Sequence, residues 1–199
     1  MSRTDEVLYA LKFLREKIAF LPRSLRLMCE SIVDDLRFQT APGGVSHHHN
    51  YEGGLAIHTA EVLGHALRMT DPENPCDDIR IILTVATVFH DFHKIYEYKI
   101  EHAGSVTISP LAPDVHSDKI EITKLPYREL IGHVAGGFWE FKCAMMAIND
   151  VSYLPEDFEL RVAHCLLSHH GRLEWRSPVE PRTLEAHILH AADMLSARP

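Results

Sequence analysis

Hydrophobic residues recur at spacings of three and four along most of this chain, which predicts a mainly helical fold. The first apolar stripe consists of Val7, Leu11, Leu14, Ile18 and Leu21. It predicts an amphipathic helix over residues 5–20, and Pro22 suits the first turn of a second helix whose stripe runs from Leu25 to Leu36. We expect these two helices to form a hairpin over residues 1–40.

The same spacing predicts further helices after the glycine-containing break at residues 41–44. Their expected starts are Leu55, Asp77, Leu130, Pro155 and Thr183. A Gly-Gly pair at 136–137 indicates either a close contact with a neighbouring helix or a kink. Gly171 suits a left-handed residue at the end of the helix before it.

Residues 98–125 depart from the helical pattern, because residues 105–108 and 119–123 alternate in the way that is typical of short strands. We expect a small β-hairpin or irregular insertion here, lying over the helical core as a lid or substrate rim. The predicted fold class is therefore all-α: a helical bundle with one small insertion.

Length and composition narrow the class of protein. A chain of 199 residues suits one domain with a full core, and no apolar run approaches the ~18 residues of a membrane span. The N-terminus has no signal-peptide core, and the four cysteines lie far apart, which suits reduced thiols in the cytoplasm. The net charge of −8 argues against a long nucleic acid as partner.

The chain is rich in histidine, with 15 residues, and one of them ends its most apolar segment. Residues 79–89 are followed by His90 and Asp91, with Lys94 one helical turn further on, so all three can share a face. Burying such groups costs several kcal/mol unless something compensates, and a divalent metal would do so. The alternative interpretation is a polar helix end whose charges are solvated.

Other histidines and one aspartate also lie near helix ends or within apolar helices: His58, His133, His169, His170 and Asp193. With His90-Asp91, this pattern resembles the HD-domain metal-dependent phosphohydrolases over residues 46–197. The resemblance rests on residues 53–59, 90–94, 130–133 and 167–193. Within that superfamily, these segments look most like the HD domain of the YhaM-type 3′-to-5′ exoribonucleases.

The resemblance implies roles for these residues. The ligands implied for one divalent metal are His58, His90, Asp91 and Asp193. Those for a second metal are His133, His169 and His170, with Asp91 bridging the two sites. Lys94 would face the phosphate, acting with Asp91 in catalysis. Imidazoles and carboxylates suit Mn, Fe, Co, Ni or Zn, with Mg in a weaker role.

The candidate substrate-binding residues have simpler alternatives. His48, His49 and Arg172 are candidates for an anionic ligand, or else they belong to solvated loops. Trp175 could stack on a base, and it could equally pack under its own loop. His93 stands where the resembled family usually has glycine, and we expect its side chain to narrow the pocket or contact substrate.

The leading functional hypothesis is a phosphohydrolase acting on a small nucleotide, such as a nucleoside triphosphate or monophosphate. A 3′-to-5′ exonuclease on short single-stranded RNA or DNA is the alternative. The resembled exoribonucleases carry an OB-type domain ahead of the HD domain, whereas this chain has a helical hairpin there, which weakens the polymer hypothesis. A nucleotide-sensing module without turnover is a third hypothesis, which the complete ligand set disfavours. The chain could also form a homo-oligomer.

Overall fold

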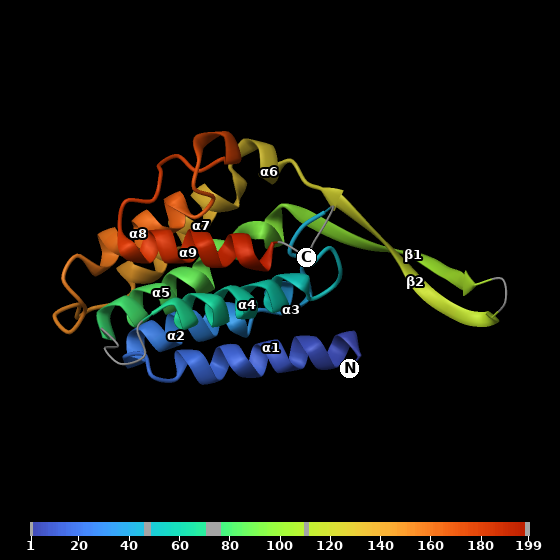
Figure 1. Cartoon of the computed structure of the whole chain (residues 1–199), viewed down its shortest axis with the longest axis horizontal. Coiled ribbons are helices and arrows are strands. Elements are labelled where there is room, and N and C mark those ends of the chain that lie inside the picture. Colours follow the sequence, from blue (N-terminus) through green and yellow to red (C-terminus); the bar gives the residue numbers. More distant parts are fainter. Residues whose placement is uncertain (1, 46–48, 71–76, 110–111, 198–199) are drawn as a thin grey trace.

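The structure is a computed structural model that describes residues 2–45, 49–70, 77–109 and 112–197. The α-helices are α1 (Arg3–Ile18), α2 (Arg23–Val33), α3 (Leu36–Thr40), α4 (Gly54–Met69), α5 (Asp77–His90), α6 (Tyr127–Leu130), α7 (Gly132–Met146), α8 (Phe158–Ser168) and α9 (Leu184–Ser196). Two short 3₁₀ helices, η1 (Phe92–Tyr96) and η2 (Leu173–Trp175), and two strands, β1 (Tyr98–Ser109) and β2 (Ala112–Lys124), complete the described elements. The predicted all-α fold with a small hairpin is confirmed (Figure 1).

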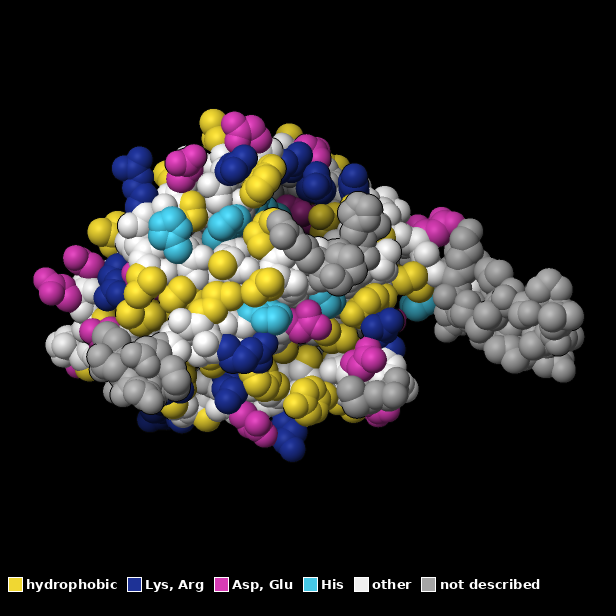
Figure 2. Space-filling model, in the orientation of Figure 1, with side chains coloured by type: hydrophobic (Ala, Val, Ile, Leu, Met, Phe, Trp, Pro, Cys, Tyr) yellow, Lys and Arg dark blue, Asp and Glu magenta, His cyan; other side chains and the backbone are white. Residues whose placement is uncertain are grey.

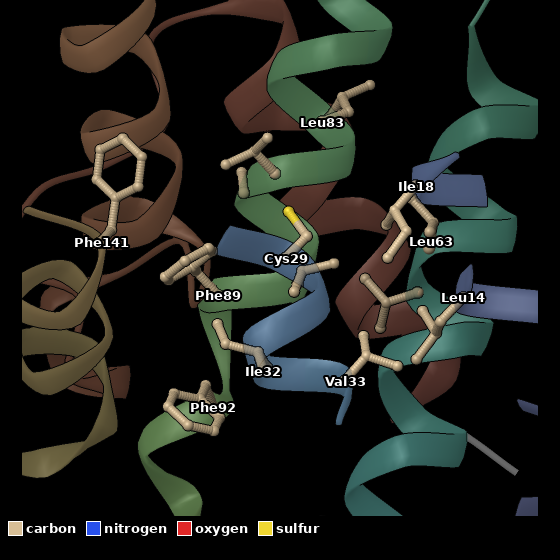
Figure 3. Close-up of a cluster of buried hydrophobic side chains, with 14 of the residues drawn as sticks. Leu14, Ile18, Cys29, Ile32, Val33, Leu63, Leu83, Phe89, Phe92 and Phe141 are labelled. Carbon is tan, nitrogen blue, oxygen red and sulfur yellow. The ribbon is translucent and has the colours of Figure 1, made fainter. Parts of the chain in front are cut away.

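Helix α5 forms the centre of the bundle and packs against α2, α4, α7, α8 and α9. Its apolar run is fully buried over residues 82–89, and Ile79 and Ile81 are half-buried, so the pattern over residues 79–89 is confirmed for most of its length: Leu83 is inaccessible to solvent and Phe89 is 1% exposed. In Figure 3 these two side chains lie between Phe141 of α7 on one side and Leu63 of α4 on the other. Each such side chain contributes about 1.5–3 kcal/mol on burial, so the end of α5 is held in a fixed position.

The N-terminal helices follow the prediction closely, with one correction. Helix α1 packs against both α2 and α4. The second helix ends at Val33, before the expected Leu36, whose side chain is 74% exposed. The reason is a new helix start, because the Asp35 side chain accepts a hydrogen bond from the Arg37 N–H and so caps α3.

The β-hairpin is longer than predicted and occupies a different place. Its strands pair antiparallel, with Ile100 opposite Ile122, and extend away from the helical body (Figure 1). The expected lid over the helical core is therefore wrong. Near the base of the hairpin, the exposed Lys99, Glu101 and Thr123 lie on one face of the ribbon, and the half-buried Ile100 and Ile122 lie on the other.

Two glycine predictions are confirmed. A Cβ on Gly136 would lie 2.2 Å from the His93 ring, and one on Gly137 would lie 2.8 Å from the Phe89 carbonyl oxygen, so α7 approaches the end of α5 closely. Gly171 has φ +84°, the left-handed conformation expected after α8. The helix expected from Leu130 is interrupted at Ile131 (φ −130°), which separates α6 from α7.

None of the described helices combines the length and the hydrophobicity that a bilayer crossing requires.

Candidate metal centre

Helix ends bring the ionisable residues together. His58 lies in the first turns of α4, His90 ends α5, and His133 begins α7. His169 and His170 follow the last residue of α8, and Asp193 lies in the last turn of α9. Figure 2 shows histidine side chains at the surface over α4, α8 and α9, whereas His58, His90 and His169 are themselves buried. The predicted ligand residues, scattered over most of the sequence, therefore meet at one place.

The first group consists of His58, His90, Asp91 and Asp193, whose nearest ligand atoms all lie within 4.8 Å of one another. The Nε2 atom of His58 is 3.1 Å from Asp91 Oδ2 and 3.2 Å from Asp193 Oδ1. The Nε2 atom of His90 is 3.4 Å from that of His58. The separations approach those of ligands about 2.1 Å from a shared ion.

The second group consists of Asp91, His133, His169 and His170, within the same 4.8 Å limit. Here Asp91 uses its other oxygen: Oδ1 is 3.3 Å from His133 Nε2 and 3.7 Å from His169 Nε2. The Nε2 atoms of His133 and His170 are 3.1 Å apart. Asp91 therefore lies between the two groups and offers one carboxylate oxygen to each.

All five histidines are held by their outer ring nitrogen. The Nδ1 atoms of His90, His169 and His170 contact the main-chain carbonyls of Thr87, Leu166 and Trp175 at 2.6, 2.7 and 2.5 Å. Those of His58 and His133 contact Ser196 Oγ at 2.9 Å and Glu97 Oε1 at 2.8 Å. A carbonyl or carboxylate oxygen requires the proton on Nδ1, which leaves the Nε2 lone pair directed into the site, as in metal-binding histidines.

Two atoms at the centre of the site have no hydrogen-bond partner. Asp91 Oδ1 and His169 Nε2 are both fully buried and unsatisfied. Leaving such atoms unpaired costs about 1–3 kcal/mol each, and more for a charged group. A cation between them would satisfy both, so the donor set and its unmet valences suit a divalent metal. The metal-ligand roles of these residues remain predictions.

The electrostatics of the site favour the protonation states in which these side chains can bind a metal. Burial lowers the pKa of His90 to about 4 and, with the neighbouring His169, that of His170 to about 2. Burial alone would raise the pKa of Asp91, but the adjacent Lys94 and His90 hold it well below its usual range. These groups are therefore neutral imidazoles and an ionised carboxylate at neutral pH, the forms that bind metals.

His58 behaves differently from His90. Burial alone would lower its pKa, but hydrogen bonds with Asp193 and Asp91 raise it to about 9. The His58 proton compensates the two buried carboxylates in the absence of a cation. Binding of a divalent ion to the first group would therefore release a proton.

Lys94 lies at the edge of the first group. Its Nζ atom is 2.5 Å from Asp91 Oδ2 and donates a hydrogen bond to the Gly43 carbonyl oxygen at 2.8 Å. Burial alone would lower the pKa of Lys94, but Asp91 and Asp193 raise it, so the side chain is a cation.

A cavity of about 390 Å³ opens beside the first group. Its walls include Gly43, His49, His58, Lys94, His170, Trp175 and Asp193. The predicted substrate residues His49 and Trp175 thus share one cavity with Lys94. Arg172 lies outside this lining, with its guanidinium carbon 5.0 Å from the centre of the Trp175 ring. His48 lies outside the described residues.

The expectation for His93 is wrong. Its side chain is 6% exposed and turns toward α6 and α7, where Nδ1 lies 2.6 Å from the Tyr127 hydroxyl of α6 and Nε2 lies 3.3 Å from Glu140 of α7. The missing Cβ of Gly136 makes room for the ring. The imidazole therefore fills a helix contact behind the site and does not narrow the cavity.

Several residues that support the site are not marked by any motif in the sequence. Ser196 contacts His58 and donates a hydrogen bond to Glu61 at 2.8 Å, while Glu61 also lies 3.2 Å from His49 Nε2. Glu97 supports His133 from a distant part of the chain. The only available signal was the spacing of Glu97, three residues after Lys94 and six after Asp91.

Comparison with known proteins points to one kind of relative. The chain is 28% identical over 187 residues to a protein named 3′-5′ exoribonuclease YhaM from Listeria innocua, a match covering 91% of this chain and 50% of that protein. It is 26% identical over 170 residues to the protein of the same name from Bacillus subtilis, covering 82% of this chain and 45% of that one.

The chain therefore spans about half the length of the curated relatives it matches. No family model matches the sequence. No solved structure was found to be similar to the fold. Over most of its length, the chain is similar to proteins that bear the name of an exoribonuclease.

Proposed function

We propose that this chain is an HD-type, divalent-metal-dependent phosphohydrolase that cleaves a phosphoester or phosphoanhydride bond of a nucleotide. The observation that carries the proposal is Asp91, because its two carboxylate oxygens face two separate groups of ligand atoms. A bridging carboxylate suits a pair of ions that share one substrate phosphate.

In this proposal, each of the two ligand groups binds one metal ion. His58, His90 and Asp193 would complete the first site, and His133, His169 and His170 the second. Mn, Fe, Co, Ni or Zn suits this mixture of imidazole and carboxylate ligands better than Mg does. When bound, the ions would supply Lewis-acid stabilisation of the phosphoryl oxygens and of the attacking and leaving groups.

The protein side chains around the cavity have separate tasks. Lys94 places an ammonium group beside the first site, where it can stabilise charge that develops on the phosphoryl group. Trp175 offers a ring that is 45% exposed on the cavity wall, suited to stacking on a base. His49 lies on the same wall, and because its ring nitrogens contact Tyr51 and Glu61, it would have to exchange one of these contacts to donate a hydrogen bond to the anionic ligand.

A small nucleotide is the first substrate candidate. The cavity of about 390 Å³ falls in the size range of small-molecule sites, and the net charge of −8 disfavours a long polyanion. A second candidate is the 3′-terminal phosphodiester bond of a short single-stranded RNA. It is favoured by the name of the relatives that match over 91% of this chain.

A substrate panel tests the proposal. The purified chain would be incubated with Mn²⁺ and, separately, with nucleoside triphosphates, nucleoside monophosphates and a short single-stranded RNA or DNA. We expect phosphate or nucleoside release that stops when a chelator is added. Stepwise shortening of the oligonucleotide, with the mononucleotides untouched, would replace the first candidate with the second. Absence of any turnover with metal-loaded protein would overturn the proposal.

A further inference from the structure

Glu97 is a buried carboxylate attached to the second ligand group through His133. Its Oε1 atom accepts two hydrogen bonds from that residue, one from the backbone N–H at 2.7 Å and one from ring Nδ1 at 2.8 Å. The whole residue is 1% exposed. A negative charge buried this deeply needs a compensating partner. The His133 imidazole is the closest side chain to Glu97, and Arg128 Nε lies 3.8 Å from its other oxygen, Oε2.

The 3₁₀ turn explains how one short segment reaches both sides of His133. The backbone N–H of Lys94 bonds to the Asp91 carbonyl at 2.9 Å, and that of Glu97 bonds to the Lys94 carbonyl at 3.0 Å. Residues three apart eclipse one another in such a turn. Asp91 and Glu97 therefore lie on one side of it, and the His133 ring lies between them, with Nε2 facing Asp91 and Nδ1 facing Glu97.

His133 is distinguished from the other four ligand histidines by the charge of its support. Among the described residues, three of those rings donate Nδ1–H to main-chain carbonyls and one contacts a hydroxyl. The ligand groups differ in charge as well. The first contains two carboxylates, whereas the second has only the shared Asp91. Glu97 lies behind the His133 ring and supplies a negative charge that the second ligand group itself lacks.

We infer that Glu97 is a positioning residue for a second metal ion: it fixes His133 with Nε2 directed at the ion and places a negative charge behind that ring. The inference rests on the proposed metal-binding function and adds a residue to it. Supporting carboxylates of this kind typically contribute 10- to 100-fold in metal affinity. A purely structural role is the competing explanation, because the same oxygen also caps the N-terminus of α7.

Two variants separate these explanations. Glu97→Gln keeps an oxygen that can cap α7 and accept the ring N–H, but it removes the charge. Glu97→Ala removes both. The matched control is Glu129→Gln. Glu129 and Glu97 both line a second cavity, but Glu129 pairs with Arg128 and Arg176 at the surface. Each protein would be titrated with Mn²⁺ by calorimetry and examined by electron paramagnetic resonance, with circular dichroism to verify folding.

For the unaltered chain and Glu129→Gln, we expect two ions per chain and the spectrum of a magnetically coupled pair. The second ion should bind about tenfold more weakly in Glu97→Gln and about 100-fold more weakly in Glu97→Ala, with the first ion retained and the coupled spectrum lost. Two ions bound with unchanged affinity in Glu97→Gln would overturn the role of Glu97 alone. Fewer than two ions in the unaltered chain would overturn both this role and the two-ion function.

Discussion

Lys94 holds the position of a preorganised cation. Its Nζ atom is fixed by Asp91 and the Gly43 carbonyl, so little reorganisation is needed when negative charge develops in the cavity. We expect Lys94→Met to lower kcat by about 10²- to 10³-fold, the loss typical of removing one such donor, while metal content stays unchanged. Steady-state kinetics and elemental analysis on the same sample would check this.

The control for Lys94 is Lys99→Met, because Lys99 is exposed at the base of the hairpin and pairs with Glu101 at 2.7 Å. Equal activity of Lys94→Met and the unaltered chain would show that the ammonium group only neutralises Asp91.

Trp175 should affect substrate binding more than turnover. Its ring lies on the cavity wall, whereas its main-chain carbonyl, not its side chain, holds His170. Removal of a stacking ring costs about 1–3 kcal/mol per base, so Trp175→Ala should raise KM for a nucleotide by about 5- to 150-fold with kcat nearly unchanged. Trp139→Ala is the control, since that ring is 67% exposed on α7. An unchanged KM in Trp175→Ala would remove the stacking role.

At the scale of single residues, the sequence indicated which side chains meet at the candidate site better than it indicated the residues that hold them in place. Histidines at the ends of apolar helices are visible as a pattern, because burial makes a polar residue in such a place unusual. The support of His58 by Ser196 joins residues 138 positions apart, and no local pattern records such a contact. The direction of His93 depended in the same way on Gly136 in a later helix.

The packing of α7 against η1 and α6 can be tested at Gly136, with Gly64 of α4 as the control. A Cβ on Gly136 would lie 2.2 Å from both His93 and the Tyr127 hydroxyl, so Gly136→Ala should destabilise the fold by about 1–3 kcal/mol. In Gly64→Ala, the nearest neighbour is the flexible Arg68 side chain at 3.4 Å, and gain of helix propensity should leave stability equal or up to about 1 kcal/mol higher. Urea denaturation measures both, and equal stability of Gly136→Ala and the unaltered chain would contradict the close contact.

The hairpin should be dispensable for the metal centre. Ile100 and Ile122 are paired, so residues 101–121 can be replaced by an Asn-Gly turn without disturbing the strand register. Because the removed part projects away from the helices (Figure 1), we expect stability and metal content to stay close to those of the unaltered chain.

A change at the base of the hairpin provides the contrast. Tyr98 is 8% exposed, so Tyr98→Ala should lower the free energy of unfolding by about 3 kcal/mol.

The metal content of the chain in which residues 101–121 are replaced would be measured by elemental analysis after dialysis. Loss of metal from this shortened chain would show that the hairpin supports the site.

Element boundaries show what spacing alone could predict. The apolar repeats located α1, α4 and α5 because those helices bury one continuous stripe in the core. The break between α6 and α7 depends on the backbone at Ile131 and Gly132, the latter with φ +77°, which hydrophobic spacing does not record. The direction of the hairpin was also hidden, since alternation predicts strands and not the surface against which they lie.

Across the whole molecule, acidic residues outnumber basic ones, and some of this acidic excess lies in the candidate site. The chain carries 28 acidic residues against 20 lysines and arginines, and two of its acids, Asp91 and Asp193, are turned inward among the histidines. Two divalent ions would offset part of that charge where the proposed substrate phosphate would approach. The relatives are about twice as long as this chain, so their name bears on the substrate only through the shared half.

In the proposed site, the carboxylate of Asp91 serves both ions, and the metal content of Asp91→Asn tests this. The substitution keeps the size of the side chain but removes the charge that both groups share. After loading with Mn²⁺ and dialysis, we expect two ions per chain in the unaltered protein and fewer than one in Asp91→Asn, with phosphohydrolase activity lost in parallel. Two retained ions in a folded Asp91→Asn protein would contradict the account.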